Sequence, residues 1–461
     1  MTATSRSLSF ALKSATVRSS SGRFLRELLA NEHLPQDELQ ARQDHAARAI
    51  AEHAMQESPF YRRLYGERGI DPRILDDPRR WAELPILDRA TAKAHSGEFA
   101  TPEAVGRSVR TALTGGSTGE PLRTLHDARV PSLALAWRMY SWWGIQPYDD
   151  LARIGRWSFG RMDAVKNTIA WWPTRQLSLD AAVISEETMT EFHRAVTRVR
   201  PRLLEGYVGA LLELADFLER RGLRIPAPTA VATTAAPLTA PVRARLEDAF
   251  EAPVHDEYRG SEFGWMAGEC DRQDGLHIFS DVRRIEVVDA DGRPAPPGEE
   301  GDLVITDLRN RVFPMLRYRN GDRGILRERS CPCGRSLPLM EPPQGRTIDV
   351  LHLPSGASLA HRLTALFSAH PESVRLFQIH QQADASLTIR VVPGPGERSR
   401  RHVEDAVEDL RTRIRHEVPV RIEYVESLPY TGGKTKYILS DLPAVVPQAP
   451  TPPPDTPSVR A

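Results

Sequence analysis

The chain of 461 residues has little cysteine, no net charge and no long apolar run. Its 61 basic residues equal its 61 acidic ones, so it has no general electrostatic attraction for nucleic acid or for an anionic membrane. No apolar stretch approaches the roughly 20 residues of a membrane-spanning helix. Three cysteines cannot all pair with one another, which argues against a secreted disulfide scaffold. We therefore expect a cytoplasmic protein with neither nucleic acid nor membrane as a partner.

Lysine is also scarce, because arginine supplies almost all of the positive charge. Two of the few lysines, Lys434 and Lys436, stand two positions apart near the C-terminus, just after Gly432-Gly433. A lysine pair in a chain that otherwise uses arginine calls for an explanation. The solvated tip of a hairpin is one explanation.

Residues 111–119 hold three glycines and four hydroxyl side chains. Glycines allow successive backbone N–H groups to turn inward around an anion, and hydroxyl groups add donors for phosphate oxygens. The stretch lacks the lysine of a Walker loop, since Glu120 follows the last glycine. An ordinary surface turn is the alternative. The predicted phosphate-binding residues are Thr114, Gly115, Gly116, Ser117, Thr118 and Gly119.

The rest of the chain predicts one large and one smaller domain. Short apolar strands alternate with helices between about residues 150 and 250, which favours a mostly parallel sheet with helices on its faces. Successive hairpins are expected from residue 285 to 326, and a compact α+β unit follows. The basic, Ser-rich residues 1–23 resemble a transit peptide in composition, but we expect a frayed arm there, and the Pro-rich residues 443–461 predict a disordered tail.

Two acidic motifs have the chemistry of a nucleotide site. In the first, a short strand delivers Tyr258, Ser261 and Glu262, whose ring, hydroxyl and carboxylate suit an adenine, an α-phosphate and Mg²⁺. In the second, Asp322 follows a glycine turn and offers two acceptors to the diol of a ribose. An edge strand with a surface glutamate is the alternative for the first motif.

All three cysteines lie in two short segments, Cys270 near His277 and Cys331 near Cys333. Three thiolates and one imidazole would complete a tetrahedral zinc site, closed and therefore structural. Buried free cysteines are the alternative.

These stretches, taken in order, resemble the adenylate-forming enzymes from about residue 55 to 442. Residues 258–262 are similar to that superfamily's Tyr-Gly-x-Thr-Glu motif, with Arg259 in place of the glycine. Gly345-Arg346 resembles its hinge motif, although Ile348 stands where the hinge aspartate is usual, and residues 429–434 resemble its Pro-x-Thr-x-x-Gly-Lys loop. The Cys-x-Cys-Gly-Arg run at 331–335 looks most like the phenylacetate–CoA ligase and capsule-biosynthesis adenylating branch.

The resemblance implies an α/β fold: a large ATP- and acid-binding domain over residues 1–345 and a small mobile α+β domain over 346–442. It implies Arg346 as a nucleotide contact, Asp322 as the ribose ligand, and Lys434, with Glu262, as the catalytic residues. Tyr207 and Trp265 are the expected walls of the acid pocket.

The implied function is an AMP-forming ligase that uses Mg·ATP to adenylate a small, aromatic carboxylic acid and passes the acyl group to coenzyme A. Two alternatives remain at this stage: transfer to a carrier-protein thiol or an amine in natural-product or polymer assembly, and a non-catalytic nucleotide-binding relative. The second alternative is raised by the departures at Arg259 and Ile348, and by Ala236, which stands where a glutamate is common in the superfamily.

Overall fold

The computed structural model describes most of the chain. The described residues are 3–16, 19–113, 122–155, 168, 171–181, 184–343, 351–355, 358–359, 366–367, 369–428 and 437–442. Among them, no helix combines the length and the apolar character needed to cross a membrane.

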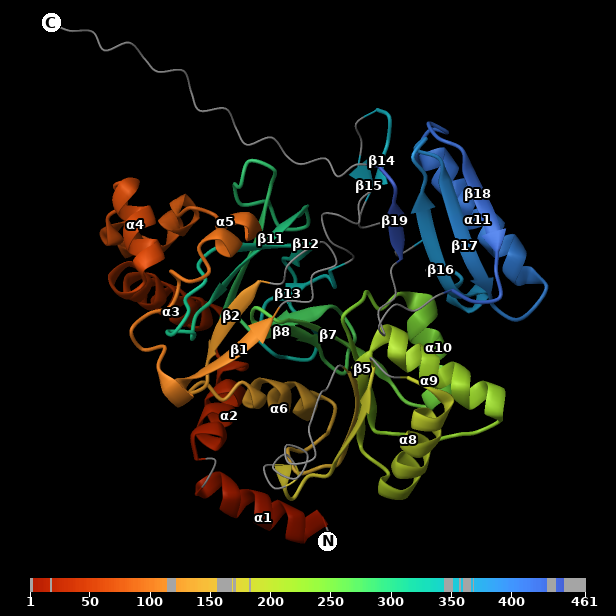
Figure 1. Ribbon diagram of the computed structural model, residues 1–461, viewed down its shortest axis with the longest axis horizontal. Helices are drawn as coiled ribbons and strands as arrows, with labels where there is room; N and C mark the ends of the chain where they lie inside the picture. Colours follow the sequence, from red (N-terminus) through yellow and green to blue (C-terminus); the bar gives the residue numbers. More distant parts are fainter. Residues whose placement is uncertain are drawn as a thin grey trace, which may run out of the picture.

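An 11-stranded mixed sheet organises the large domain, in the order β10-β11-β12-β13-β9-β8-β7-β6-β5-β3-β4 (Figure 1). Neighbouring strands from β4 to β7 are parallel. These strands are β3 (Leu151–Gly155), β4 (Gln176–Asp180), β5 (Leu203–Tyr207), β6 (Ala230–Thr234) and β7 (Val254–Gly260). The short strands β3, β5 and β6 are buried on both faces, as in parallel sheets covered by helices.

The other half of the sheet is antiparallel, as the predicted hairpins require. It comprises β8 (Gly264–Glu269), β9 (Leu276–Ile278), β10 (Arg283–Val288), β11 (Glu300–Asp307), β12 (Tyr318–Arg327) and β13 (Leu339–Met340). A separate hairpin of β1 (Val109–Leu113) and β2 (Arg123–Asp127) brackets the predicted phosphate loop.

Helices cover the sheet in two groups. The N-terminal group is α1 (Ala3–Ala15), α2 (Ser19–Asn31), α3 (Gln36–Glu57), α4 (Pro59–Glu67) and α5 (Arg89–Ala94). The second group lies beside the parallel strands and comprises α6 (Leu133–Trp142), α8 (Glu186–Val199), α9 (Val208–Arg221) and α10 (Ala240–Phe250) (Figure 1). Trp137, Trp142 and Trp143 are buried in one apolar cluster and are therefore core residues.

The C-terminal unit is a four-stranded sheet in the order β18-β17-β16-β19, with helix α11 (Arg398–Arg413) between β17 and β18 in the chain. It packs on α10 through β16 and the turn η4 (Pro371–Ser373), and Figure 1 shows it above α9 and α10. Its strands are β16 (Val374–Gln381), β17 (Leu387–Pro393), β18 (Val420–Tyr424) and β19 (Ile438–Ser440); a small hairpin, β14 (Leu351–His352) and β15 (Ser358–Leu359), precedes them. The mixed α/β fold is therefore confirmed.

The N-terminal segment differs from the frayed arm that we expected. Residues 3–15 form helix α1, whose Phe10 packs edge-on against Trp137 of α6 with ring centroids 5.3 Å apart. Arg6 pairs with buried Asp150. These tertiary contacts hold a segment whose composition alone predicts fraying. The predicted tail, residues 443–461, lies outside the described residues.

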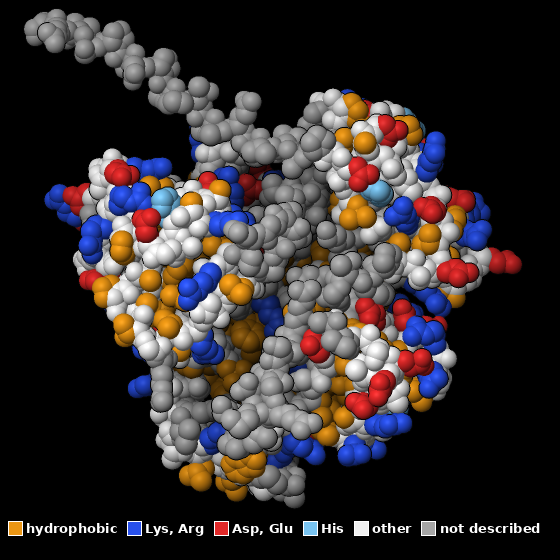
Figure 2. Space-filling model, viewed as in Figure 1, with side chains coloured by type: hydrophobic (Ala, Val, Ile, Leu, Met, Phe, Trp, Pro, Cys, Tyr) orange, Lys and Arg blue, Asp and Glu red, His pale blue; other side chains and the backbone are white. Residues whose placement is uncertain are grey.

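A buried ion pair ties α6 to the antiparallel half of the sheet. Arg138 Nη1 donates to Asp281 Oδ2 at 2.8 Å, and both side chains are almost completely buried. The guanidinium also lies over the ring of Phe279, 4.4 Å from its centroid. The surface around this core mixes acidic and basic side chains, as Figure 2 shows for one face.

We predict that Asp281→Ala lowers the free energy of unfolding by about 3–5 kcal/mol, because it leaves the guanidinium of Arg138 buried without its counter-charge. Urea denaturation of wild type and variant measures the difference. The control is Glu38→Gln, which removes the exposed pair of Glu38 with Arg42 and should leave the midpoint unchanged. Equal midpoints for Asp281→Ala and wild type would contradict the prediction.

Candidate active site

Strand β7 lies where the sheet changes direction, because it pairs in parallel with β6 and antiparallel with β8. Ligands of open α/β sheets bind outside the carboxyl ends of the parallel strands, and residues 258–262 lie at the carboxyl end of β7. The pairing of β7 with β8 shifts register between Tyr258 and Arg259. Irregularities of this kind re-aim side chains next to active sites. The predicted motif at 258–262 therefore occupies the position in the fold that favours a ligand.

The structure brings Tyr258 and Asp322 together, although 64 residues separate them. The Tyr258 hydroxyl donates to Asp322 Oδ2 at 2.8 Å. Asn320 Nδ2 donates both to that hydroxyl, at 2.6 Å, and to the same carboxylate oxygen, at 2.8 Å. Burial, together with the charge of Asp322, raises the pKa of Tyr258 well above its usual value, so its hydroxyl keeps the proton that it donates. Sequence reasoning missed Asn320, although it lies two residues before Asp322.

Glu262 and Ser261 follow β7 in a tight turn. Arg89 Nη1 lies 3.4 Å from Glu262 Oε1, so a cation on α5 partly balances this carboxylate. The carbonyl of Ser261 lies 2.8 Å from Nε2 of His126, a residue of β2. The hairpin that carries the predicted phosphate loop is therefore anchored beside Glu262.

A buried charge cluster lies on the opposite face of β7 from Tyr258. Arg259 Nη1 is 2.6 Å from Glu205 Oε1 on β5, and Arg153 Nε on β3 is 3.3 Å from the other oxygen of Glu205. Tyr140 of α6 donates to Glu205 at 2.5 Å. Burial opposes ionisation of Glu205, but the two guanidinium groups outweigh it and lower its pKa to about 2. Sequence reasoning identified no partner for Arg259, because Glu205 comes near it only through the order of the strands in the sheet.

The two expected walls of the acid pocket pack in different places. Tyr207 precedes α9 and packs against the apolar cluster beneath the parallel strands, whereas Trp265 of β8 packs against the cluster around α6. The guanidinium of Arg259 lies over the Trp265 ring, 5.5 Å from its centroid. Trp265 therefore adjoins the charge cluster described above.

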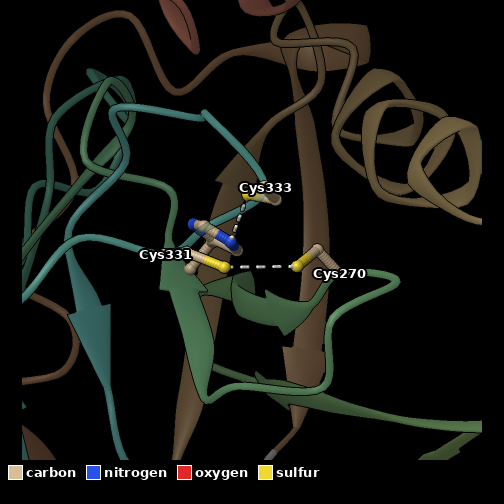
Figure 3. A group of neighbouring side chains, drawn as sticks. Cys270, Cys331 and Cys333 are labelled. Carbon is tan, nitrogen blue, oxygen red and sulfur yellow. Dashed lines mark hydrogen bonds between the residues drawn. The ribbon is translucent and has the colours of Figure 1, made fainter.

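The four predicted metal ligands converge on one point. Cys270 Sγ lies 3.7 Å from Cys331 Sγ, and Cys333 Sγ lies 3.4 Å from His277 Nε2 (Figure 3). All four ligand atoms lie within 4.8 Å of one another. Two sulfur ligands of tetrahedral zinc, each about 2.3 Å from the metal, lie roughly 3.8 Å apart. The spacing thus fits a tetrahedral Cys₃His centre.

The surroundings of His277 fit a metal ligand as well. Its Nδ1 lies 3.3 Å from the carbonyl oxygen of Leu337, which leaves Nε2 directed at the cysteines. Histidine ligands usually donate their other ring N–H to such an acceptor. Burial lowers the pKa of His277 to about 4, so the ring is neutral at pH 7.

Several predicted residues lie outside the described part of the chain. They are Thr114, Gly115, Gly116, Ser117, Thr118, Gly119, Arg346 and Lys434. Their roles stay predictions.

Comparisons with known proteins concern the sequence and the fold as a whole. No family model matches the chain. A phenylacetate-coenzyme A ligase of Thermus thermophilus is 27% identical over 77% of this chain and 81% of its own length. Protein CapK of Staphylococcus aureus is 23% identical over 45% of this chain and 46% of its own. A solved structure of 2-hydroxyisobutyryl-CoA ligase in the postadenylation state shares the fold, with a TM-score of 0.73, 20% identity, and coverage of 89% of this chain and 91% of that one.

The chain is thus similar in sequence to phenylacetate-coenzyme A ligases and shares the fold of 2-hydroxyisobutyryl-CoA ligase, in agreement with the resemblance that its motifs carry. Its similarity to both phenylacetate-coenzyme A ligase and protein CapK agrees with the predicted resemblance to that branch of the adenylate-forming enzymes.

Asp256 lies on the same face of β7 as Tyr258, and its ionisation affects how the stability of the fold depends on pH. Burial, with the nearby charge of Glu269, raises its pKa to about 7. Folding therefore takes up a proton between the unfolded pKa of about 4 and pH 7, and stability falls as pH rises through that window by at most about 1.4 kcal/mol per unit.

We predict that Asp256→Asn loses less stability than wild type between pH 5 and pH 8, because the amide does not titrate. Urea denaturation of both proteins at the two pH values measures this difference. Parallel pH dependence would show that Asp256 is ionised in the folded protein.

Proposed function

We propose that the chain activates a small, aromatic carboxylic acid with Mg·ATP and transfers the acyl group to coenzyme A. The observation that carries the proposal is the hydrogen-bonded array of Tyr258, Asn320 and Asp322 beside Glu262, at the point where the sheet changes direction. The printed names of the relatives support an acid–CoA ligase.

In the first half-reaction an oxygen of the substrate carboxylate attacks the α-phosphorus of ATP in line. The bond to the pyrophosphate oxygen breaks, and an acyl adenylate and pyrophosphate form. Asp322, held by Tyr258 and Asn320, accepts from the ribose hydroxyls. Lys434 stabilises the negative charge that gathers at the α-phosphate.

Mg²⁺, when bound, neutralises phosphate charge, and Glu262 would hold it through a carboxylate oxygen. Arg89 orients that carboxylate from α5. The phosphate loop at 114–119 would supply backbone donors to the phosphate oxygens, and the bond of His126 to Ser261 fixes the base of its hairpin.

In the second half-reaction a thiol sulfur attacks the acyl carbon, AMP leaves with the bonding electron pair, and the thiol proton passes to solvent. Rotation of the small domain would withdraw Lys434 and admit the acceptor. Coenzyme A is the acceptor that the relatives' names favour over a carrier-protein thiol or an amine. Release of AMP with coenzyme A alone distinguishes these acceptors.

We also propose that Cys270, His277, Cys331 and Cys333 bind a structural Zn²⁺. The tetrahedral spacing, the burial and the acceptor behind His277 support it. Four protein ligands leave no open position, so the ion would contribute folding energy and no chemistry.

For the catalytic role of Lys434, we predict carboxylate-dependent exchange of labelled pyrophosphate into ATP by the wild type. A panel of aryl and short aliphatic acids is tested. Lys434→Ala should lose about 10²- to 10³-fold in exchange rate, the usual effect of removing one group that stabilises transition-state charge.

Lys13→Ala is the matched control, since Lys13 on α1 donates to the carbonyl of Trp172, and it should leave exchange unchanged. Loss in Lys436→Ala but not in Lys434→Ala would transfer the role to Lys436. No exchange with any acid, despite intact ATP binding, would favour the non-catalytic alternative.

For the metal, we predict about one zinc per purified chain by inductively coupled plasma mass spectrometry. Cys331→Ser should lose most of the zinc and unfold at lower temperature, whereas His193→Gln, a histidine outside the cluster, should keep it. Zinc at background level in the wild type would mean that the residues form a cluster of free thiols.

A further inference from the structure

The charge cluster around Arg259 contains buried polar groups that have no hydrogen-bond partner among the described residues. Glu257 is fully buried and lies 3.5 Å from Arg259 Nη1, yet neither of its carboxylate oxygens accepts a hydrogen bond among the described residues. The indole N–H of Trp265, whose ring faces Arg259, likewise has no acceptor there. Unsatisfied buried polar groups are rare in folded proteins and call for a partner.

The cluster also carries unequal charge. Burial raises the pKa of Glu257 to about 8, against the attraction of Arg259, so this carboxyl group is mostly protonated at pH 7. Glu205 is ionised. Two guanidinium groups thus face one carboxylate, which leaves about one positive charge unbalanced in a buried site.

Arg259 is the accessible member of the cluster. Its side chain keeps 22% of its surface exposed, whereas those of Arg153, Glu205 and Glu257 keep 9%, 2% and 0%. Glu205 and Glu257 both contact Nη1 of this guanidinium, and among the described residues no acceptor is seen for its remaining N–H groups. A planar guanidinium matches a carboxylate in geometry as well as in charge.

Arg259 lies within the motif that carries the proposed reaction. It directly follows Tyr258 on β7, precedes Ser261 and Glu262, and lies over the ring of Trp265, an expected wall of the acid pocket. A glycine, as in the motif that this stretch resembles, would leave this space without a side chain. In this chain a cation occupies it.

We propose that Arg259 binds a second carboxylate of the substrate, so that the acid activated by this protein is a small dicarboxylic acid. The proposal rests on the proposed function and refines its substrate class. Arg153 and Glu205 act as positioning residues, because they hold the guanidinium and do not themselves reach the substrate.

The test measures acid binding by calorimetry in the presence of AMP, using acids matched in length. 4-Carboxyphenylacetate is compared with 4-methylphenylacetate, and glutarate with pentanoate. We expect wild type to bind each dicarboxylate at least tenfold more tightly than its partner. Arg259→Met, which keeps the length of the side chain without its charge, should abolish the preference, and Arg259→Lys should keep part of it.

Thermal unfolding of each variant shows whether it is folded, and the comparison of acids within wild type does not depend on the variants. Equal or tighter binding of the monocarboxylates by wild type overturns the proposal. Pyrophosphate exchange is measured with the same acids. Exchange with monocarboxylates alone rejects the second carboxylate but keeps the ligase; selective binding of dicarboxylates without exchange keeps the role of Arg259 and rejects the ligase.

Discussion

The site depends on one constraint, the two kinds of pairing made by β7. Its parallel bonds to β6 place its carboxyl end beside those of β3 and β5, and its antiparallel bonds to β8 join it to the hairpins that carry Asp322. Successive side chains of this strand therefore point into two different environments, one on each face of the sheet. Tyr258 faces the array with Asn320 and Asp322, and Arg259 faces the buried charges.

The electrostatics of the two faces differ for a physical reason. On the first face, the neutral donors Tyr258 and Asn320 hold the partly exposed carboxylate of Asp322. On the second, burial is severe enough that the protein keeps one glutamate ionised only by placing two guanidinium groups on it, while a neighbouring glutamate retains its proton. Polar clusters of this kind specify a particular partner because any wrong partner leaves a buried group unsatisfied.

Much of this fold follows from local patterns in the sequence. The predicted alternation of short strands with helices between about residues 150 and 250 matches the parallel strands β3 to β7 and their helices, and the spacing of the cysteines and His277 predicted the four side chains that converge. The pairing of Arg259 with Glu205 was not predictable, since it requires β7, β6, β5 and β3 to be neighbours in that order. Helix α1 was missed for a related reason: its stability comes from Trp137, more than 100 residues away.

The cysteine cluster has a consequence for the array of Tyr258, Asn320 and Asp322. Cys270 and Cys331 are 61 positions apart, and the segment between them contains both Asn320 and Asp322. The proposed zinc, held at both ends, would close this segment into a loop and remove much of its conformational freedom in the unfolded chain. A chelator would then act as an inhibitor at a distance, by loosening the strand that carries Asp322.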